Sequence, residues 1–387
     1  MKSVNQTFGK LGTTIFTVMS ALASEHKAIN LGQGFPDDEG PDDVREVAAR
    51  ALLDGPNQYP PMMGLPALRQ AVAENNRRFY GLDLDWSEEV MVTSGATEAL
   101  AACLLGLLNP GDEAVVIEPL YDSYLPIIRL AGAVPKVVSL TPPDWSLSVD
   151  DLAAAFSDRT KLLLMNSPMN PTGKVFGAEE LTAIANLVTR HDAYAVCDEV
   201  YEHLVFSGHR HTPLMTLPGM RDRTARIGSA GKTLSLTGWK VGYISAAPAV
   251  LSAMSKAHQY LTFTTPPNLQ AAVAYGLTKD DAYFSGLSSV LEAKRDILGE
   301  GLRKAGFEVL VSAGTYFLNV DFRPLGFNGP DDEFCKLITR EAGVAAVPVS
   351  AFCEAGKMTH LARFCFCKKD EVLLEASDRL ARYFGTA

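Results

Sequence analysis

The chain has 387 residues, of which 47% are hydrophobic and 21% charged, a composition typical of a water-soluble protein with a large buried core. This length predicts two domains, or one large domain with a smaller one beside it. The net charge of -10 argues against nucleic acids and anionic membranes as partners. The longest apolar run, 99–108, is about half the length of a membrane span.

The N-terminus carries neither the apolar core of a signal peptide nor the arginines of a transit helix, so we expect a cytoplasmic protein. The six cysteines are scattered, which favours free thiols over disulfides. Cys365 and Cys367 alternate with strand period, so we expect them to share a sheet face rather than to bind a metal. His209 and His211 have no carboxylate or cysteine at ligand spacing. We therefore expect no metal site.

Short apolar runs alternate with helical patterns through the middle of the chain. Strands are predicted at 90–94, 113–119, 136–140, 161–166, 193–198, 226–229 and 241–245, with helices between them, for example at 150–156 and 178–191. Buried strands that alternate with helices predict a mostly parallel sheet covered on both faces, a three-layer α/β/α domain. Ligands of such sheets bind at the carboxyl ends of the strands.

The pattern changes after residue 275. A long helix is predicted at 283–305, followed by strands at 307–311 and 316–322 and by two more near 345–348 and 363–367, which flank a helix. This order indicates a smaller α+β domain. We expect the first residues to join it, because 29–36 reads as an entry loop rather than as a sheet strand. The predicted domains are therefore 40–275, and 1–39 together with 276–387.

Three of the predicted strands end in polar groups. The first leads into the turn Thr93–Thr97, where a helix begins, and helix N-termini bind anions, although the same residues are common as plain caps. Asn170 follows another strand, in a segment that alone would be an ordinary turn. Asp198 ends a third. A buried carboxylate costs several kcal/mol unless it is paired, and a protonated pyridine would serve as its cationic partner.

A fourth strand end, Ser229–Gly242, is the most informative stretch. Lys232 lies among small hydroxyl and glycine residues, and Lys240 follows eight positions later. A lysine placed in this way can form a Schiff base with a carbonyl compound. The hydroxyl and the second cation suit a phosphate. Both features together predict a site for pyridoxal 5′-phosphate (PLP), although Ser229–Lys232 alone would equally fit a loop with a surface lysine.

In order and content these motifs resemble the class I, fold-type-I PLP-dependent aminotransferases, whose fold is aspartate-aminotransferase-like. The resemblance extends over nearly the whole chain, from 32–36 to 363–366. Segments 30–36, 228–233, 238–242 and 363–366 are most similar to the kynurenine/glutamine/methionine aminotransferase branch.

The resemblance implies a role for each cofactor residue. Lys232 would bind the cofactor as a Schiff base and move a proton between substrate and cofactor. Asp198 would pair with the pyridine nitrogen, Tyr201 and Asn170 would hydrogen-bond the phenolic oxygen, and Tyr121 would stack on the ring. The phosphate would be held by Gly95, Ala96, Thr97, Ser229 and Lys240. Tyr59 would reach the phosphate of a neighbouring subunit, which requires a homodimer with shared active sites.

The resemblance also implies a substrate site. Arg363 would bind the α-carboxylate, helped by Gly34, Asn170 and Tyr121, because a planar guanidinium suits a carboxylate. The side-chain pocket, placed by position in the chain, would consist of Ile15, Phe16, Tyr59, Tyr121 and Phe352. No second arginine stands out as a partner for a side-chain carboxylate, so we expect methionine, glutamine or aromatic donors rather than aspartate.

Two residues depart from the pattern of the family. Lys240 stands where many members have arginine, which lowers the expected affinity for phosphate. Thr264 stands where some relatives have a distinctive side chain that faces the substrate pocket of the partner subunit. The substrate of such a relative is therefore harder to assign to this chain.

The leading interpretation is an aminotransferase that passes the amino group of an L-amino acid to a 2-oxo acid by a ping-pong mechanism. A cysteine-S-conjugate β-lyase and an N-succinyldiaminopimelate aminotransferase remain alternatives, because the same residues would serve them. A regulator that binds PLP without turnover is disfavoured. The motifs begin near residue 30, which leaves no room for a basic DNA-binding domain before them, and the net charge is negative.

Overall fold

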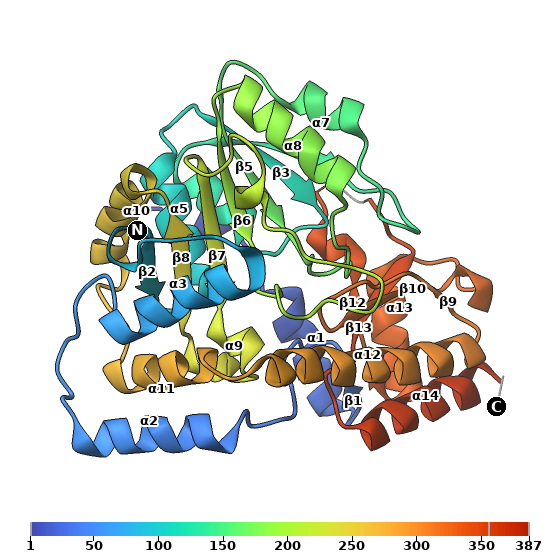
Figure 1. Cartoon of the computed structure of the whole chain (residues 1–387). Helices are drawn as coiled ribbons and strands as arrows, with labels where there is room; N and C mark the ends of the chain where they lie inside the picture. The colour runs from blue at the N-terminus through green and yellow to red at the C-terminus, as the bar shows by residue number, and fades with distance from the viewer. Residues whose placement is uncertain (1, 355–356, 386–387) are drawn as a thin grey trace.

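A seven-stranded sheet forms the centre of the computed structural model, which describes residues 2–354 and 357–385 (Figure 1). Its strand order is β2 (Val90–Thr93), β8 (Gly242–Ala246), β7 (Thr224–Ser229), β6 (Tyr194–Asp198), β5 (Thr160–Asn166), β3 (Glu113–Glu118) and β4 (Val134–Ser139). Strand β8 runs antiparallel to both neighbours, and the remaining pairs of the sheet are parallel. The predicted mostly parallel sheet is therefore confirmed.

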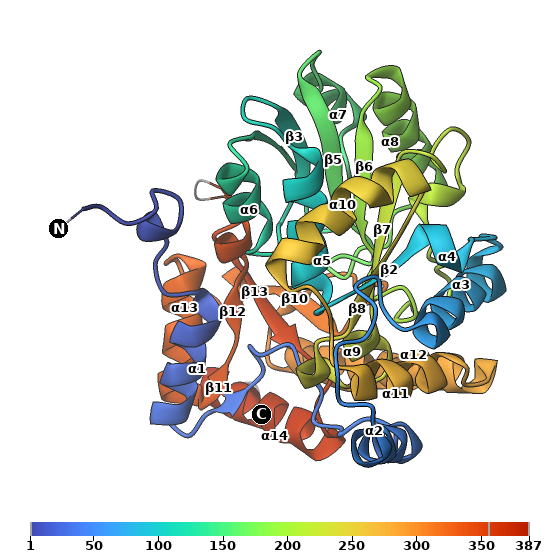
Figure 2. The ribbon, with the colours of Figure 1, turned by 90° about the vertical axis from the view of Figure 1, so that its left-hand side faces the viewer.

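Both faces of this sheet are covered by apolar cores. Successive strand residues point to opposite faces, so Val116 and Leu164 pack into one core while Val115 and Leu163 pack into the other. The first core includes residues of α5 (Ala96–Leu107) and α10 (Pro248–Leu261), and the second those of α7 (Val149–Ala155) and α8 (Ala178–Arg190). Figure 2 shows the two pairs of helices on opposite sides of the strands. This is the expected three-layer α/β/α arrangement.

A second, antiparallel sheet of four strands lies beside the first (Figure 1). Its order is β12 (Val347–Pro348), β13 (Leu361–Cys365), β10 (Phe317–Asp321) and β9 (Glu308–Val309). Helices α12 (Asp281–Lys304), α13 (Asp331–Leu337) and α14 (Asp370–Phe384) accompany it. The C-terminal part is thus α+β, as the sequence predicts.

The N-terminal segment corrects one expectation. Residues 29–36 were expected to form a loop without a strand, but β1 (Ile29–Asn30) pairs in parallel with β11 (Val344–Ala345). Two residues are too few to show a strand period, so the sequence pattern could not reveal this pairing. Helix α1 (Ile15–Glu25) lies next to β11 and β12 (Figure 2). The domain boundaries given above stay a prediction.

The remaining elements connect these layers. The other α-helices are α2 (Asp42–Asp54), α3 (Pro66–Tyr80), α4 (Trp86–Glu89), α6 (Tyr124–Leu130), α9 (Ala230–Thr233) and α11 (Pro267–Leu277). Short 3₁₀ helices occur at Phe8–Lys10, Leu214–Thr216, Thr237–Trp239, Arg323–Leu325 and Val349–Phe352, and a π-helix at Ile338–Ala342. Within 2–354 and 357–385, none of the helices has the length and apolar character needed to cross a bilayer.

Candidate active site

The polar groups at the strand ends meet around one cavity. Strands β2, β5, β6 and β7 end at this edge of the sheet, and the antiparallel β8 begins there, which brings Lys240 to the same place. The cavity has a volume of about 270 Å³, near the small end of ligand pockets, which suits a small metabolite. Of the residues predicted to bind the cofactor or the substrate carboxylate, all except Tyr59 line it: Gly34, Gly95, Ala96, Thr97, Tyr121, Asn170, Asp198, Tyr201, Ser229, Lys232, Lys240 and Arg363.

One side of the cavity has the hydrogen-bond donors of an anion-binding site. Gly95, at φ +81°, precedes helix α5, whose first turn carries backbone N–H groups without helical partners. A Cβ on Gly95 would lie 3.2 Å from Lys240 Cε, and a Cβ on Gly242 would lie 2.6 Å from the Gly95 carbonyl carbon. The two glycines therefore let the start of β8 approach the helix closely. Ser229 adds a hydroxyl from the end of β7, and this donor set suits a phosphate.

A buried carboxylate lies at the end of β6. Asp198 Oδ2 accepts a 2.6 Å hydrogen bond from the Tyr124 hydroxyl, and the Val200 N–H donates to Oδ1 at 3.4 Å. Burial raises the pKa of Asp198 to about 6, against the opposing effects of these hydrogen bonds and of Lys232. The cationic partner that the sequence predicts is a protonated pyridine supplied by the cofactor. Within the described part of the chain the carboxylate forms no ion pair, and a phenol is its side-chain partner.

The amine of Lys232, on α9, points into the cavity. Its Nζ donates a 2.6 Å hydrogen bond to the Tyr316 hydroxyl, and that hydroxyl donates to the Gly34 carbonyl oxygen at 2.8 Å. Burial lowers the pKa of Lys232 to about 8. A larger share of the amine is therefore neutral, and nucleophilic, near neutral pH than in an exposed lysine.

A buried guanidinium closes the other side of the cavity. Arg363, on β13, is only 1% exposed. Its Nη1 donates to Asn170 Oδ1 at 2.9 Å and its Nη2 to the Gly32 carbonyl at 2.7 Å, while its buried Nε has no hydrogen-bond partner. The Phe317 ring lies 4.0 Å from the guanidinium carbon. Burial lowers the pKa of Arg363 to about 10, so the group stays charged. Among the described residues this buried cation has no carboxylate in an ion pair with it, so it is suited to receive an anion from the cavity.

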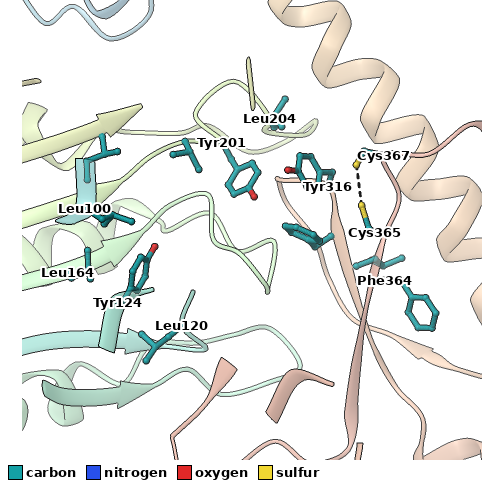
Figure 3. Packing of buried hydrophobic residues seen from close by; sticks show 14 of the residues in the cluster. Leu100, Leu120, Tyr124, Leu164, Tyr201, Leu204, Tyr316, Phe364, Cys365 and Cys367 are labelled. Carbon is teal, nitrogen blue, oxygen red and sulfur yellow. Dashed lines mark hydrogen bonds between the residues drawn. The ribbon is translucent and has the colours of Figure 1, made fainter. Parts of the chain in front are cut away.

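Aromatic rings form the walls. Tyr121 lines the cavity and meets Tyr124 edge to face at 5.8 Å, and Tyr201 meets Tyr316 at 5.2 Å. Figure 3 shows Tyr201, from the large-sheet side, facing Tyr316, which comes from the C-terminal strands. Burial raises the pKa of Tyr201 well above its ordinary value, so this phenol keeps its proton.

Only part of the pocket predicted for the side chain of the substrate lies at the cavity. Phe16 lines the cavity together with Tyr121, whereas Ile15 and Phe352 do not. Phe352 packs behind Phe16, with ring centres 5.7 Å apart. Tyr59 lies outside the cavity, with 82% of its surface exposed.

Three side chains of this site were missed in the sequence. Asn166 donates to the Asp198 carbonyl and accepts from the Asn170 N–H, both at 2.7 Å, and so links two strand ends. Tyr124 donates a hydrogen bond to Asp198, and Tyr316 accepts one from Lys232. Tyr124 stands three positions after Tyr121, just behind the same strand, which is a signal that could have been used. Tyr316 looked like the first residue of an ordinary strand.

The weak metal candidates have other contacts. The thiols of Cys365 and Cys367 lie 3.1 Å apart and are buried (Figure 3). His211 Nε2 lies 2.8 Å from a Glu199 carboxylate oxygen in the interior. Across the described residues, no three His, Cys, Asp or Glu side chains gather at a spacing that could hold a metal ion.

Comparisons with known proteins place the chain in a family. The family model for aminotransferase class I and II matches residues 26–380. The probable N-succinyldiaminopimelate aminotransferase DapC of Mycobacterium tuberculosis is 46% identical to this chain, over 95% of this chain and 96% of its own length. A solved structure of N-succinyldiaminopimelate aminotransferase from M. tuberculosis is 45% identical and has a TM-score of 0.96. The match covers 98% of this chain and 100% of that chain. The methionine aminotransferase of Escherichia coli is 42% identical over 96% of both chains.

The fold matches solved enzymes of the same kind. An aspartate aminotransferase structure from Thermus thermophilus, a single mutant, is 31% identical with a TM-score of 0.91, over 99% of this chain and 100% of that one. The protein described here therefore belongs to the class I and II aminotransferase family and has an aspartate-aminotransferase-like fold. It is an aminotransferase, as the sequence motifs predicted.

Proposed function

We propose that this aminotransferase uses PLP to move the amino group of an L-amino acid with an uncharged side chain, of the methionine, glutamine or aromatic/kynurenine type, to a 2-oxo acid. The observation that carries the proposal is the convergence of Lys232, Asp198 and Arg363 on one small cavity. A carbonyl cofactor requires an amine of lowered pKa, and its ring nitrogen requires a buried carboxylate. The carboxylate of the substrate requires a buried guanidinium.

The residues fit this cofactor. The start of α5, with Ser229 and Lys240, supplies donors and positive charge that suit a phosphate dianion. Asp198 would pair with the pyridine nitrogen, Tyr201 and Asn170 would hydrogen-bond the phenolic oxygen, and Tyr121 would cover the ring. When bound, the cofactor supplies an electron sink and carries the amino group between the two substrates.

The protein's own groups then have defined tasks. Lys232 would take the proton from the substrate Cα and deliver it to the cofactor C4′, and would move a proton in the reverse direction in the second half-reaction. This task requires a neutral amine. Asp198 keeps the ring nitrogen protonated, and a contact of this kind is worth roughly 4 kcal/mol at an effective dielectric of about 20. Arg363 fixes the α-carboxylate and thereby orients the Cα–H bond toward the amine.

The charges around the cavity favour an uncharged side chain in the donor. Among the described residues that line the cavity, the lysines and arginines are Lys232, Lys240 and Arg363, and each already has a task. A second carboxylate on the substrate would lack a partner from this chain. Phe16 and Tyr121 provide apolar wall instead. The M. tuberculosis relative favours N-succinyldiaminopimelate as a second candidate, since it is 46% identical. A cysteine-S-conjugate β-lyase activity would use the same residues.

The proposal includes a homodimer with shared active sites, in which Tyr59 reaches the phosphate of the neighbouring subunit. Tyr59 and Tyr260 are 82% and 86% exposed, and the Tyr59 ring meets Phe263 at 5.5 Å. Exposed aromatic clusters of this kind are typical of contact surfaces. Thr264, in the adjoining loop, has a buried hydroxyl without a hydrogen-bond partner. The cytoplasmic location stays a prediction.

A titration tests the function. The purified protein, saturated with PLP, is mixed with single L-amino acids in the absence of any 2-oxo acid, and the visible absorbance of the cofactor is followed. Methionine, glutamine or aromatic donors should convert the cofactor to its amine form in one half-turnover. Conversion by N-succinyldiaminopimelate far ahead of these donors would select the second candidate. Release of pyruvate from a cysteine conjugate, with return of the original band, would select the lyase.

A further inference from the structure

Tyr316 joins three distant parts of the chain at one oxygen atom. Its hydroxyl accepts a 2.6 Å hydrogen bond from Lys232 Nζ on α9 and donates a 2.8 Å bond to the Gly34 carbonyl in the N-terminal segment. Tyr316 itself lies just before β10 and is 1% exposed. The amine, the C-terminal strands and the segment expected to meet the substrate carboxylate are therefore in direct contact.

The ring of Tyr316 is held in place by its neighbours. It meets Phe317 at 4.7 Å and Tyr201 at 5.2 Å between ring centres. A Cβ on Gly34 would lie 2.7 Å from Phe317 Cζ and 3.5 Å from Tyr316 Cε2, so this glycine lets the backbone approach both rings. The hydroxyl cannot leave its place unless these groups repack.

We propose that Tyr316 is a positioning residue that holds the amine of Lys232 whenever this amine is not bonded to the cofactor, and that its bond to Gly34 couples this state to the substrate-facing segment. The inference rests on the proposed function, in which the substrate amine displaces Lys232 from the cofactor. A freed lysine has four rotatable bonds and loses precision unless a fixed group holds its nitrogen.

The directions of the hydrogen bonds support this role. The single proton of the phenol is used on Gly34, so the phenol oxygen can only accept from Lys232. Burial raises the pKa of Tyr316 well above its ordinary value, which keeps that proton in place. A neutral Lys232 thus spends one N–H on Tyr316 and keeps its lone pair for the proton on the substrate Cα.

The first test uses the cofactor-free protein and the variant Tyr316→Phe, which keeps the ring and removes the acceptor. The rate of covalent PLP uptake, followed by absorbance across the pH range, reports the neutral fraction of Lys232. Asp198, Arg363, Cys365, Cys367 and Tyr201 also act on this amine and are the same in both proteins. Because the phenol oxygen stabilises the ammonium form, its loss should move the midpoint down by about one pH unit.

The second test separates positioning from binding. With a substrate deuterated at Cα, Tyr316→Phe should lower kcat by about 10- to 100-fold, leave KM within about twofold, and increase the isotope effect, since proton transfer becomes slower. The matched control is Tyr243→Phe, which removes a buried phenol oxygen 3.4 Å from Glu202 and should change neither measurement.

An unchanged uptake midpoint together with an unchanged isotope effect in Tyr316→Phe would overturn the inference. Failure of the wild-type protein to react with any amino acid would instead contradict the proposed function. The uptake midpoint would still decide the role of Tyr316 in that case, because it requires no turnover.

Discussion

The hydroxyl of Tyr124 lies 2.6 Å from Asp198 Oδ2 and donates a side-chain hydrogen bond to this buried carboxylate. Tyr124 begins helix α6 and Asp198 ends strand β6, so the bond spans two neighbouring elements at the carboxyl edge of the sheet. The Tyr124 hydroxyl and the longer Val200 N–H contact satisfy the carboxylate only in part, and burial still raises the pKa of Asp198 to about 6. The pair therefore holds a partly satisfied carboxylate in the cavity for a cationic ligand.

Asp198→Asn is expected to stabilise the cofactor-free protein at neutral pH. The folded wild-type carboxyl, with a pKa of about 6 instead of 3.8, keeps its proton where the unfolded chain has lost its own. The wild-type free energy of unfolding therefore falls as the pH rises through this window, by up to about 3 kcal/mol, and the variant lacks this loss. Urea unfolding of both apo-proteins over this range measures the difference.

The same variant should lose catalytic power. An Asp198 contact worth roughly 4 kcal/mol corresponds to a loss of about 10³-fold in kcat. Tyr124→Phe, which keeps the carboxylate, is the milder control. A wild-type protein that equals or exceeds Asp198→Asn in stability at neutral pH would contradict the assignment of a buried, incompletely paired carboxylate.

Arg363→Ala should lower kcat/KM by roughly 10²- to 10³-fold, from the 3–5 kcal/mol typical of removing one partner of a buried ion pair. The affinity for PLP should change less than kcat/KM, because Arg363 is assigned to the substrate carboxylate and reaches the proposed cofactor residues through its bond to Asn170, while its second bond is to the Gly32 carbonyl. Steady-state kinetics and a PLP binding curve measure both quantities. A loss of less than tenfold would remove Arg363 from the substrate site.

Lys240→Ala should weaken PLP binding by about 10- to 100-fold, the range of one or two charge-assisted contacts to a phosphate. Lys240→Arg should bind within a few-fold of the wild type, because arginine also supplies a cation at this point. Fluorescence titration of the apo-protein with PLP gives these constants. Lys256→Ala, a change on the exposed surface of α10, is the control for net charge. Equal affinity of the alanine variants would show that Lys240 does not hold the phosphate.

Shared active sites can be tested by complementation. Lys232→Ala and Tyr59→Ala subunits are each expected to be impaired as pure proteins. A mixed dimer would combine the intact Lys232 of one subunit with the intact Tyr59 of the other. Because half of the dimers are mixed after equal exchange, about a quarter of wild-type activity should return. Activity that remains at the level of the separate variants would contradict the sharing of Tyr59.

The central part of the fold and most of the cavity could be predicted from the sequence. Asp198 ends an apolar strand, Asn170 and Lys232 follow closely after two others, and the carboxyl ends of parallel strands lie at one edge. Recognising each residue at the end of a strand was therefore sufficient to predict that these residues lie near one another.

Contacts between distant segments could not be predicted in this way. Tyr316 meets Lys232 across 84 residues of chain, and the packing of the C-terminal strands against the large sheet decides that contact. The two-residue strand β1 is likewise defined by its partner β11 and has no period of its own. The role of Tyr59 depends on a second subunit, so neither the sequence pattern nor a single chain determines it.

The stoichiometry of one half-reaction tests the proposed function of Lys232 most directly. The PLP-loaded protein is mixed with excess L-methionine or L-glutamine without an acceptor, and the 2-oxo acid released is measured by mass spectrometry. One equivalent of oxo acid per subunit is expected from the wild type and none from Lys232→Ala. Release of oxo acid by Lys232→Ala at the wild-type rate, or no release by the wild type with any donor, would contradict this function.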